Sequence, residues 1–222
     1  MRSPRRRSLI TTVEVIMGIL VLLVLAGLVM PMICRASTAA QKSQAANDMT
    51  QVTTAVMAFR TDYGSYPIDP SVSRKVDAVY GCPGWSHHNS EVLNVLRADG
   101  ADPGPNFRDA VNTRKVEYMD IPIVRDLSNP KRGLGTGKES NGFGVTTAGE
   151  FYDPWGSPYI IFIDANGDGF CDLGRVYSDF TSPGANRQAQ VTAASLGPDK
   201  QIGTKGNRKF AGSDDVILGY PY

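Results

Sequence analysis

The first part of the chain carries one long apolar run. Nineteen residues, Val15 to Ile33, follow one another without a charged side chain. As a helix this run would be roughly 28 Å long, at about 1.5 Å per residue, which is close to the ~30 Å hydrocarbon core of a bilayer. The pattern therefore predicts a transmembrane helix over residues 10–35.

An amphipathic pattern follows the apolar run. Apolar residues recur at alternating steps of four and three, which is the spacing of one helix face: Ala45, Met49, Val52, Val56, Phe59 and Tyr63. Gly64 supplies a stop signal, and Pro67 comes three residues later. The pattern predicts an amphipathic helix half over residues 36–64, continuous with the first half in one helix of about fifty residues. A coiled-coil stalk is the alternative, although the stripe is short and lacks flanking charge pairs.

Residues 65–150 read as a variable region with long loops. The segment "SEVLNVLRADG" predicts a short helix, with Ser90 as the N-cap and Gly100 as the stop. From residue 101 to 150 the chain is rich in Gly, Asn, Pro and charged residues, which is typical of exposed loops with little regular structure.

Residues 151–222 have the pattern of a small β-sheet. The apolar, β-branched run Tyr159–Ile163 follows a Pro and Gly turn and is the strongest strand signal. Further strands are predicted at 174–179, 191–196 and 215–220, and Trp155 and Tyr159 are expected to anchor the sheet to the long helix. The predicted fold class is α+β: a long N-terminal helix, with a transmembrane and an amphipathic half, packed on a small antiparallel β-sheet domain.

The charge distribution orients this arrangement. The net charge is +1, and without the four arginines of the basic leader, residues 1–9, it becomes −3. A mildly acidic body argues against a nucleic-acid partner. Arginines ahead of an apolar run place the N-terminus in the cytoplasm and the rest of the chain outside. A cleavable secretory signal ending in "MICRASTAA" is the alternative.

Two residues of the predicted transmembrane segment, residues 10–35, do not serve membrane spanning. Glu14 puts a carboxylate at the start of the run, where it costs free energy unless it has a partner or lies at the headgroup level. Pro31 removes a helical hydrogen bond near its end. A second role for this segment is therefore expected.

Together these residues carry a family resemblance. The basic leader, Glu14, Pro31 seventeen residues later and the helix ending in "FRTDYGSYP" resemble a type IV pilin-like prepilin. The downstream "YDPWGSPYI", "SLGPDK" and "GSDDVI" are similar to the major pseudopilin of type II secretion systems, the general secretion pathway protein G type. The likeness covers roughly residues 5–67 and 150–217.

The resemblance implies processing and assembly roles for named residues. Family members are cut by a prepilin peptidase after a Gly, and the new N-terminus, commonly Phe, is methylated. Counting back from Glu14 places the cut between Leu9 and Ile10, where this chain has neither Gly nor Phe. Glu14 would pair with the terminal ammonium of a neighbouring copy and fix its axial register, since an unpaired buried charge is costly. Pro31 would mark where the packed helix loosens.

The function implied is that of a structural subunit and not of an enzyme. Its partners would be itself, as a helical homopolymer, other pseudopilins, the prepilin peptidase, the membrane, and an inner-membrane assembly platform driven by a cytoplasmic ATPase. The implied location is the bacterial inner membrane, single-pass, with a periplasmic C-terminal domain. Alternatives are a type IV or competence-type pilin and a membrane-tethered periplasmic binding protein or enzyme, which would need a pocket with convergent polar groups.

Acidic residues near the C-terminus form a candidate calcium site. Calcium takes six to eight oxygen ligands from carboxylates and carbonyls. The resemblance implies side-chain ligation by Asp199, Asp214 and Asp215, and main-chain ligation near Leu196 and Ile217. The loop between them is basic, and salt bridges from its cations are the alternative to an ion: Lys200, Lys205, Arg208 and Lys209.

A weaker second ion site is found in "DANGDGFCD". Asp164, Asn166 and Asp168 match the start of an EF-hand loop, but Arg175 stands where the closing Glu belongs. Asn-Gly and Asp-Gly also favour a hairpin turn, and this interpretation is preferred.

Other candidate chemistry is sparse. The sequence holds no HExxH pattern, no G-x-S-x-G motif and no phosphate loop, and its neighbouring histidines, His87 and His88, are typical of a polar loop. Of the three cysteines, Cys82 and Cys171 could form one disulfide in an oxidising compartment.

Overall fold

The structure is a computed structural model that describes residues 11–70, 72–98, 111–137, 148–181 and 188–220, without the side chains of 28–34. Its first element is the helix α1, Thr12–Tyr63. The chain divides into two compact units, Met1–Gln41 and Lys42–Tyr222, which are described separately below.

The second unit holds two sheets. Four strands pair in the order β1-β4-β5-β6, all antiparallel: β1 (Ala78–Tyr80), β4 (Ile160–Ile163), β5 (Val191–Ser195) and β6 (Val216–Ile217). A separate antiparallel pair joins β2 (Gly133–Thr136) to β3 (Ala148–Tyr152). Between β1 and β2 lies the helix α2, Asn89–Arg97. Two 3₁₀ turns, Leu173–Arg175 and Thr204–Gly206, complete the described elements.

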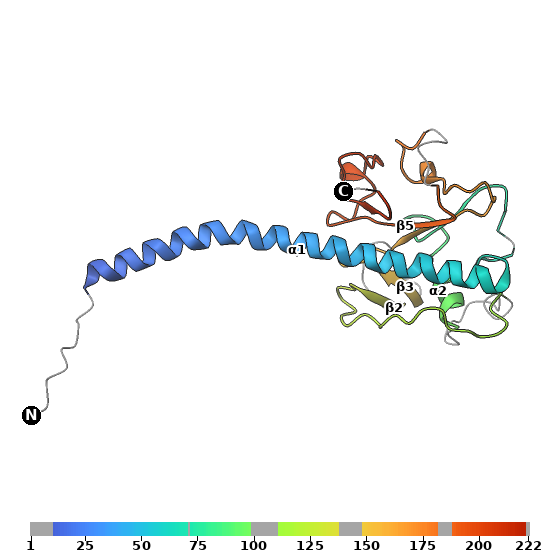
Figure 1. The fold of residues 1–222 in the computed structure, drawn as a ribbon, viewed down its shortest axis with the longest axis horizontal. Helices are drawn as coiled ribbons and strands as arrows, with labels where there is room; N and C mark the ends of the chain where they lie inside the picture. The colour runs from blue at the N-terminus through green and yellow to red at the C-terminus, as the bar shows by residue number, and fades with distance from the viewer. Residues whose placement is uncertain (1–10, 71, 99–110, 138–147, 182–187, 221–222) are drawn as a thin grey trace, which may run out of the picture. The chain divides into compact units, whose positions relative to one another are not determined.

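The stripe of α1 packs into the main core of this unit, along the sheets (Figure 1). Ala45, Met49, Val52, Val56 and Phe59 are all fully buried, as the spacing predicted. Burying side chains of this size stabilises a fold by about 1.5–3 kcal/mol each. Burial of this apolar face therefore explains why the helix from Lys42 onwards is part of the same compact unit as the sheets.

Polar contacts fix the register of the same helix. Tyr159 donates its hydroxyl to Oδ2 of Asp48 at 2.8 Å, and Gln44 donates to Oδ1 at 2.7 Å. The predicted anchoring by Tyr159 is confirmed, and Trp155 lies in the same core. Burial raises the pKa of Asp48, and the two hydrogen bonds oppose this effect. A buried carboxylate on the apolar face thus has its oxygen atoms satisfied.

One side chain of α2 joins the two sheets. Asn89 is fully buried, and its Nδ2 donates to the carbonyls of Phe151 and Tyr159, at 3.0 and 2.9 Å. Its Oδ1 accepts from the amide of Phe151 at 3.0 Å. The amide side chain therefore adds to the direct backbone bond that the amide of Tyr159 donates to the carbonyl of Phe151 at 3.0 Å.

The predicted fold class is wrong. The chain divides into its two compact units within α1, between Gln41 and Lys42. Strand pairing is mixed, because an isolated parallel bridge between Ile123 and Leu134 accompanies the antiparallel ladders. One long helix packed on a single antiparallel sheet is not what these residues form.

The predicted membrane location is also wrong. Within the part of the chain that the structure describes, no helix is both long enough and apolar enough to cross a membrane. This finding contradicts a transmembrane half at 10–35 and a single-pass inner-membrane protein with a periplasmic domain.

Several local predictions differ from the structure. The N-cap of α2 is His88 and not Ser90, because the amide of His88 donates to the Glu91 carboxylate at 3.0 Å and closes the first turn there. Strands at 191–196 and within 159–163 and 215–220 are confirmed as β5, β4 and β6. The segment 174–179 is not a strand, because a 3₁₀ turn begins at Leu173. The loop region 101–150 contains β2 and the start of β3.

Candidate metal centre

The structure brings three predicted ligands together. Asp199, Asp214 and Asp215 each offer a carboxylate oxygen, and these atoms all lie within 4.8 Å of one another. Asp215 precedes β6 directly, and Asp199 follows β5 by four residues. Because β5 and β6 are paired, with Ser195 opposite Val216, the two loops that carry the aspartates start side by side.

Hydrogen bonds within the loops orient the carboxylates. The amide of Asp199 donates to Oδ2 of Asp214 at 3.1 Å, and the amide of Gly203 donates to Oδ2 of Asp215 at 2.9 Å. Oδ1 of Asp199 accepts from the amide of Gln201 at 2.8 Å. Each aspartate is thus held by one described backbone amide and keeps oxygen lone pairs for a further partner.

Asp215 is the unusual member of the cluster. It is 2% exposed, and its Oδ1 has no described partner within hydrogen-bond geometry, although the buried Tyr177 hydroxyl lies close enough to act on this carboxylate and lower its pKa. Burial raises the pKa of Asp215 to about 6, and the charges of Asp214 and Asp199 act in the same direction. A buried carboxylate is costly unless its charge is balanced, so Asp215 is the member of the cluster that most needs a polar or charged partner.

The two predicted main-chain ligands lie close to the aspartates along the chain. Leu196 and Ile217 are buried at the ends of the paired strands. The amide of Tyr220 donates to the carbonyl of Ile217 at 3.1 Å. Gly197 has a positive φ of 70°, and a Cβ there would lie 2.5 Å from the carbonyl oxygen of Asp214. Only glycine permits this approach of the two loops.

The nearby cations do not take the place of an ion. Arg208 donates its guanidinium to the carbonyls of Val176 and Arg175, at 2.9 and 2.8 Å. Among the described residues no ion pair joins Lys200, Lys205, Arg208 or Lys209 to the three aspartates. The three carboxylates supply oxygen donors, the kind of ligand that calcium prefers.

The second candidate ion site is organised as a turn. Oδ1 of Asp164 accepts from the amides of Gly167 and Asp168, at 2.7 and 3.1 Å, and Oδ2 accepts from Gly169 at 2.9 Å. Asn166 donates to the Asp168 carboxylate at 3.0 Å. These oxygens serve the loop itself, which favours the turn, although the loop leads to a 3₁₀ turn and not to a second strand of a hairpin.

Sequence reasoning missed a buried carboxylate in "YDPWGSP". Asp153 is fully buried, and its Oδ1 accepts from the amides of Trp155, Gly156 and Ser157 at 2.7–2.9 Å. The Ser195 hydroxyl donates to Oδ2 at 2.5 Å. Burial raises the pKa of Asp153 to about 6 despite these bonds. The Asp-Pro pair and the glycine three residues after Asp153 signal such a turn. The contact with Ser195 of β5 can be recognised only from the tertiary structure.

The N-terminal candidates have different outcomes. Leu9 and Ile10 lie outside the described residues, as does the side chain of Pro31. Glu14 accepts from the amide and the hydroxyl of Thr11, at 2.9 and 3.0 Å, and these bonds lower its pKa. The amide of Glu14 donates to the Thr11 hydroxyl at 3.3 Å. This is a capping box, which the spacing T-x-x-E could have revealed.

The cysteines and histidines have structural surroundings. Cys82 and Cys171 are buried free thiols in this structure, so the possible disulfide is not formed in it. The Cys171 thiol contacts the carbonyls of Phe162 and Ala189. His87 lies 3.1 Å from the Glu91 carboxylate and His88 lies 2.9 Å from that of Glu150.

Comparison with known proteins gives no relative. No protein-family model matches the chain, and neither the curated proteins nor the solved structures contain a match.

Proposed function

We propose that this chain is a structural subunit of a type II secretion-like filament, a pseudopilin that assembles through the apolar N-terminal part of α1. The observation that carries the proposal is the surface of residues 13–25, where eleven large apolar side chains are each at least half exposed. From Val15 to Leu25 the sequence holds no polar residue. A helix that is apolar on every side needs cover on every side.

Copies of the same helix provide that cover. Burying these side chains stabilises an assembly by roughly 10 kcal/mol or more, at about 1.5–3 kcal/mol for each fully buried side chain. That is comparable with the ~4–15 kcal/mol that association costs in lost translational and rotational freedom. A helical array, in which each helix contacts several others, buries the surface more completely than a pair does.

The sequence resemblance and the acidic cluster support the same proposal. The pilin-like pattern of Glu14 and Pro31 lies in this apolar helix. The cluster of Asp199, Asp214 and Asp215 agrees with calcium as a structural ion, which would join the loop after β5 to the loop before β6. The proposal makes further copies, other pseudopilins, a prepilin peptidase and an ATPase-driven assembly platform the partners of the chain.

The test is assembly of the full chain with Leu22→Lys, read by chemical cross-linking and electron microscopy. Leu22 is 66% exposed, so the substitution leaves the fold of one copy intact. A charge in the helix-helix contact abolishes filaments, because no partner in the array can solvate it. The matched control is Thr54→Lys, at an exposed position of the amphipathic part of α1. Filaments from Leu22→Lys would contradict the proposal.

A second pair of variants tests Glu14. Glu14→Gln removes the charge but keeps a side chain that can complete the capping box, whereas Glu14→Ala removes both. Loss of assembly in both variants supports charge pairing between copies. Assembly of Glu14→Gln with failure of Glu14→Ala would limit Glu14 to capping its own helix.

A further inference from the structure

The open edge of the four-stranded sheet carries a cleft. The strand order places β1 at one end of the sheet, so β1 pairs with β4 on one side only. Along its other side lies a cavity of about 390 Å³, lined from the preceding segment by Val72, Ser73, Val76 and Asp77, and from further elements by Trp85, His87 and Arg175. A volume of this order accommodates a small ligand or a few residues of a peptide.

The backbone of β1 has one unpaired position facing this cleft. Arg175 donates through Nη1 to the carbonyl of Asp77, and the amide of Gly81 donates to the carbonyl of His87 at 2.8 Å. Both bonds lie on the side away from β4. Because alternate residues of a strand direct their backbone groups to the same side, Val79 points its N–H and C=O there too.

Nothing in the described part of the chain bonds to these two groups of Val79. Val79 is 4% exposed, so water reaches it poorly. Buried backbone donors and acceptors are nearly always paired, and edge strands recruit partners through such groups. The neighbouring bonds at Asp77 and Gly81 limit the open position to the length of one residue pair.

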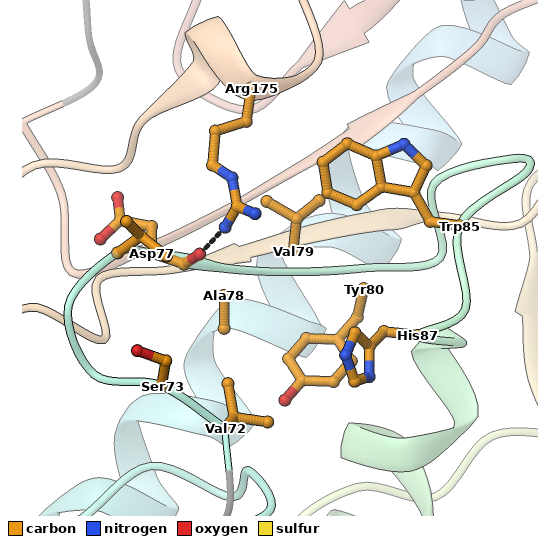
Figure 2. A pocket seen from close by; sticks show the side chains of 10 residues that line it. Val72, Ser73, Asp77, Ala78, Val79, Tyr80, Trp85, His87 and Arg175 are labelled. Carbon is orange, nitrogen blue, oxygen red and sulfur yellow. Dashed lines mark hydrogen bonds between the residues drawn. The ribbon is translucent and has the colours of Figure 1, made fainter.

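The side chains around the cleft indicate what kind of strand fits. Figure 2 shows Val79, Arg175 and Trp85 on one side of β1, and Ala78 and Tyr80 on the other, near Val72 and Ser73. The Arg175 guanidinium lies over the Trp85 ring, 5.4 Å from its centre. Among the described residues no carboxylate forms an ion pair with Arg175. The Tyr80 hydroxyl is buried and has no hydrogen-bond partner within the described segments.

We propose that the edge of β1 binds an extended segment of another protein, whose central residue pairs antiparallel with Val79 and carries a carboxylate for Arg175. The side chain of that residue lies on the same face as Val79, where the guanidinium keeps N–H donors free for a carboxylate. Its two neighbours face Tyr80 and Val72. This binding does not depend on the filament proposed above.

The probe is the capped pentapeptide Thr-Val-Glu-Val-Thr, chosen for its β-forming residues and its central carboxylate. It is added to the full, ¹⁵N-labelled chain in a mild detergent, and hydrogen exchange of the Val79 amide is followed by NMR. Binding slows this exchange by about tenfold or more at saturation, because the amide gains a partner. An unchanged Val79 amide at millimolar peptide overturns the proposal.

Two modified peptides test the geometry without altering the protein. Methylation of the central peptide nitrogen removes the donor for the Val79 carbonyl and weakens binding by about tenfold, the usual effect of one lost hydrogen bond with its steric cost. Methylation of the next nitrogen, which points away from β1, is the matched control. Equal weakening by both methyl groups overturns the paired arrangement.

The charge contact is tested by a cycle. Replacing the central Glu of the peptide by Gln weakens binding about tenfold to the unmodified chain, and has little effect with Arg175→Gln. In the Arg175→Gln protein, the side-chain amide at position 175 still offers N–H donors for the carbonyl of Asp77. The same Glu preference in both proteins overturns the role of Arg175. Protection of Val79 on concentrating the protein alone overturns the choice of a foreign segment in favour of a second copy.

Discussion

The two parts of α1 both contain large apolar side chains, but these side chains have different surroundings in the two parts. From residue 13 to 25 the large apolar side chains surround the helix and are exposed, whereas from Lys42 to Tyr63 they form one stripe that is buried in the core. Polar residues between the apolar ones make the difference. They give the second part a solvent face, so that one sheet-containing core is enough to cover it. The first part requires partners outside its own chain.

The largest expected effect is a difference in unfolding free energy between substitutions in the two parts of α1. Phe59 is fully buried and stacks on Tyr63 with ring centres 4.4 Å apart. Phe59→Ala is expected to lower the free energy of unfolding by about 3–5 kcal/mol, because it leaves a cavity. Leu22→Ala, in the exposed part, changes it by no more than about 0.5 kcal/mol.

Denaturant unfolding of the full chain, followed by the fluorescence of the core residue Trp155 and of Trp85, measures both variants. Similar losses of stability from Phe59→Ala and Leu22→Ala would contradict the distinction between the two parts of α1.

The next effect concerns how the second unit holds its turns. Asp153→Ala removes an acceptor from three buried amides and from the Ser195 hydroxyl. The expected loss is about 2–4 kcal/mol, since each orphaned donor carries a desolvation cost. Asp126 caps a similar but exposed turn through Ser128, at 2.6 and 2.9 Å. Asp126→Ala is the control and should leave the denaturation midpoint unchanged.

A smaller effect follows from the pKa of Asp215, which is about 6 in the folded chain and about 3.9 in an unfolded one. The folded state binds the proton more tightly, so this group favours folding below pH ~4 and loses that contribution as the pH rises through 6. The loss is roughly 2–3 kcal/mol. The measurement is denaturant unfolding as a function of pH, in a chelator that removes divalent cations, for the unmodified chain and for Asp215→Asn. The difference between the two proteins isolates the contribution of Asp215, because Asp153 titrates in both.

Calcium reverses this trend if it binds the cluster. The cation favours the ionised carboxylates, so the unfolding free energy at pH 7 rises with calcium concentration. Asp215→Asn should respond much less. An equal rise in both proteins would place the ion elsewhere or show a nonspecific effect.

The smallest effect is local to the first turn of α1. Thr11→Ala removes the hydroxyl that accepts a hydrogen bond from the Glu14 amide and donates one to the Glu14 carboxylate. The first turn frays, and amide exchange at residues 12–14 becomes faster. The denaturation midpoint of the second unit stays unchanged, because that unit begins at Lys42. A lowered midpoint would show that the two units are coupled.

Local patterns predicted some of these features. The buried stripe from Ala45 to Phe59 and strands β4 and β5 follow from periodicity and residue type, which act over a few neighbouring residues. The strand expected at 174–179 failed because Leu173 enters a 3₁₀ turn supported by Asp172, whose carboxylate accepts from the Gly174 amide at 3.0 Å. Strands β2 and β3 escaped notice, since their glycines give little pattern.

The candidate sites divide in the same way. The residue types of the acidic cluster could be selected from the sequence, but the burial of Asp215 and the convergence of the three carboxylates could not. Local residues signal the turn at Asp153, but its bond with Ser195 and the bond of Asn89 with Phe151 join residues 42 and 62 positions apart and depend on the fold.

The sequence by itself determined that residues 13–25 need cover from outside the chain and that residues 42–63 can bury one face in the core of their own unit. Apolar spacing along a helix is a local property. The tertiary structure decided the division of the chain at Lys42, the convergence of three aspartates and the open position at Val79. These depend on which strands pair and which remain at an edge. Contacts between distant residues decide that, and no local pattern encodes them.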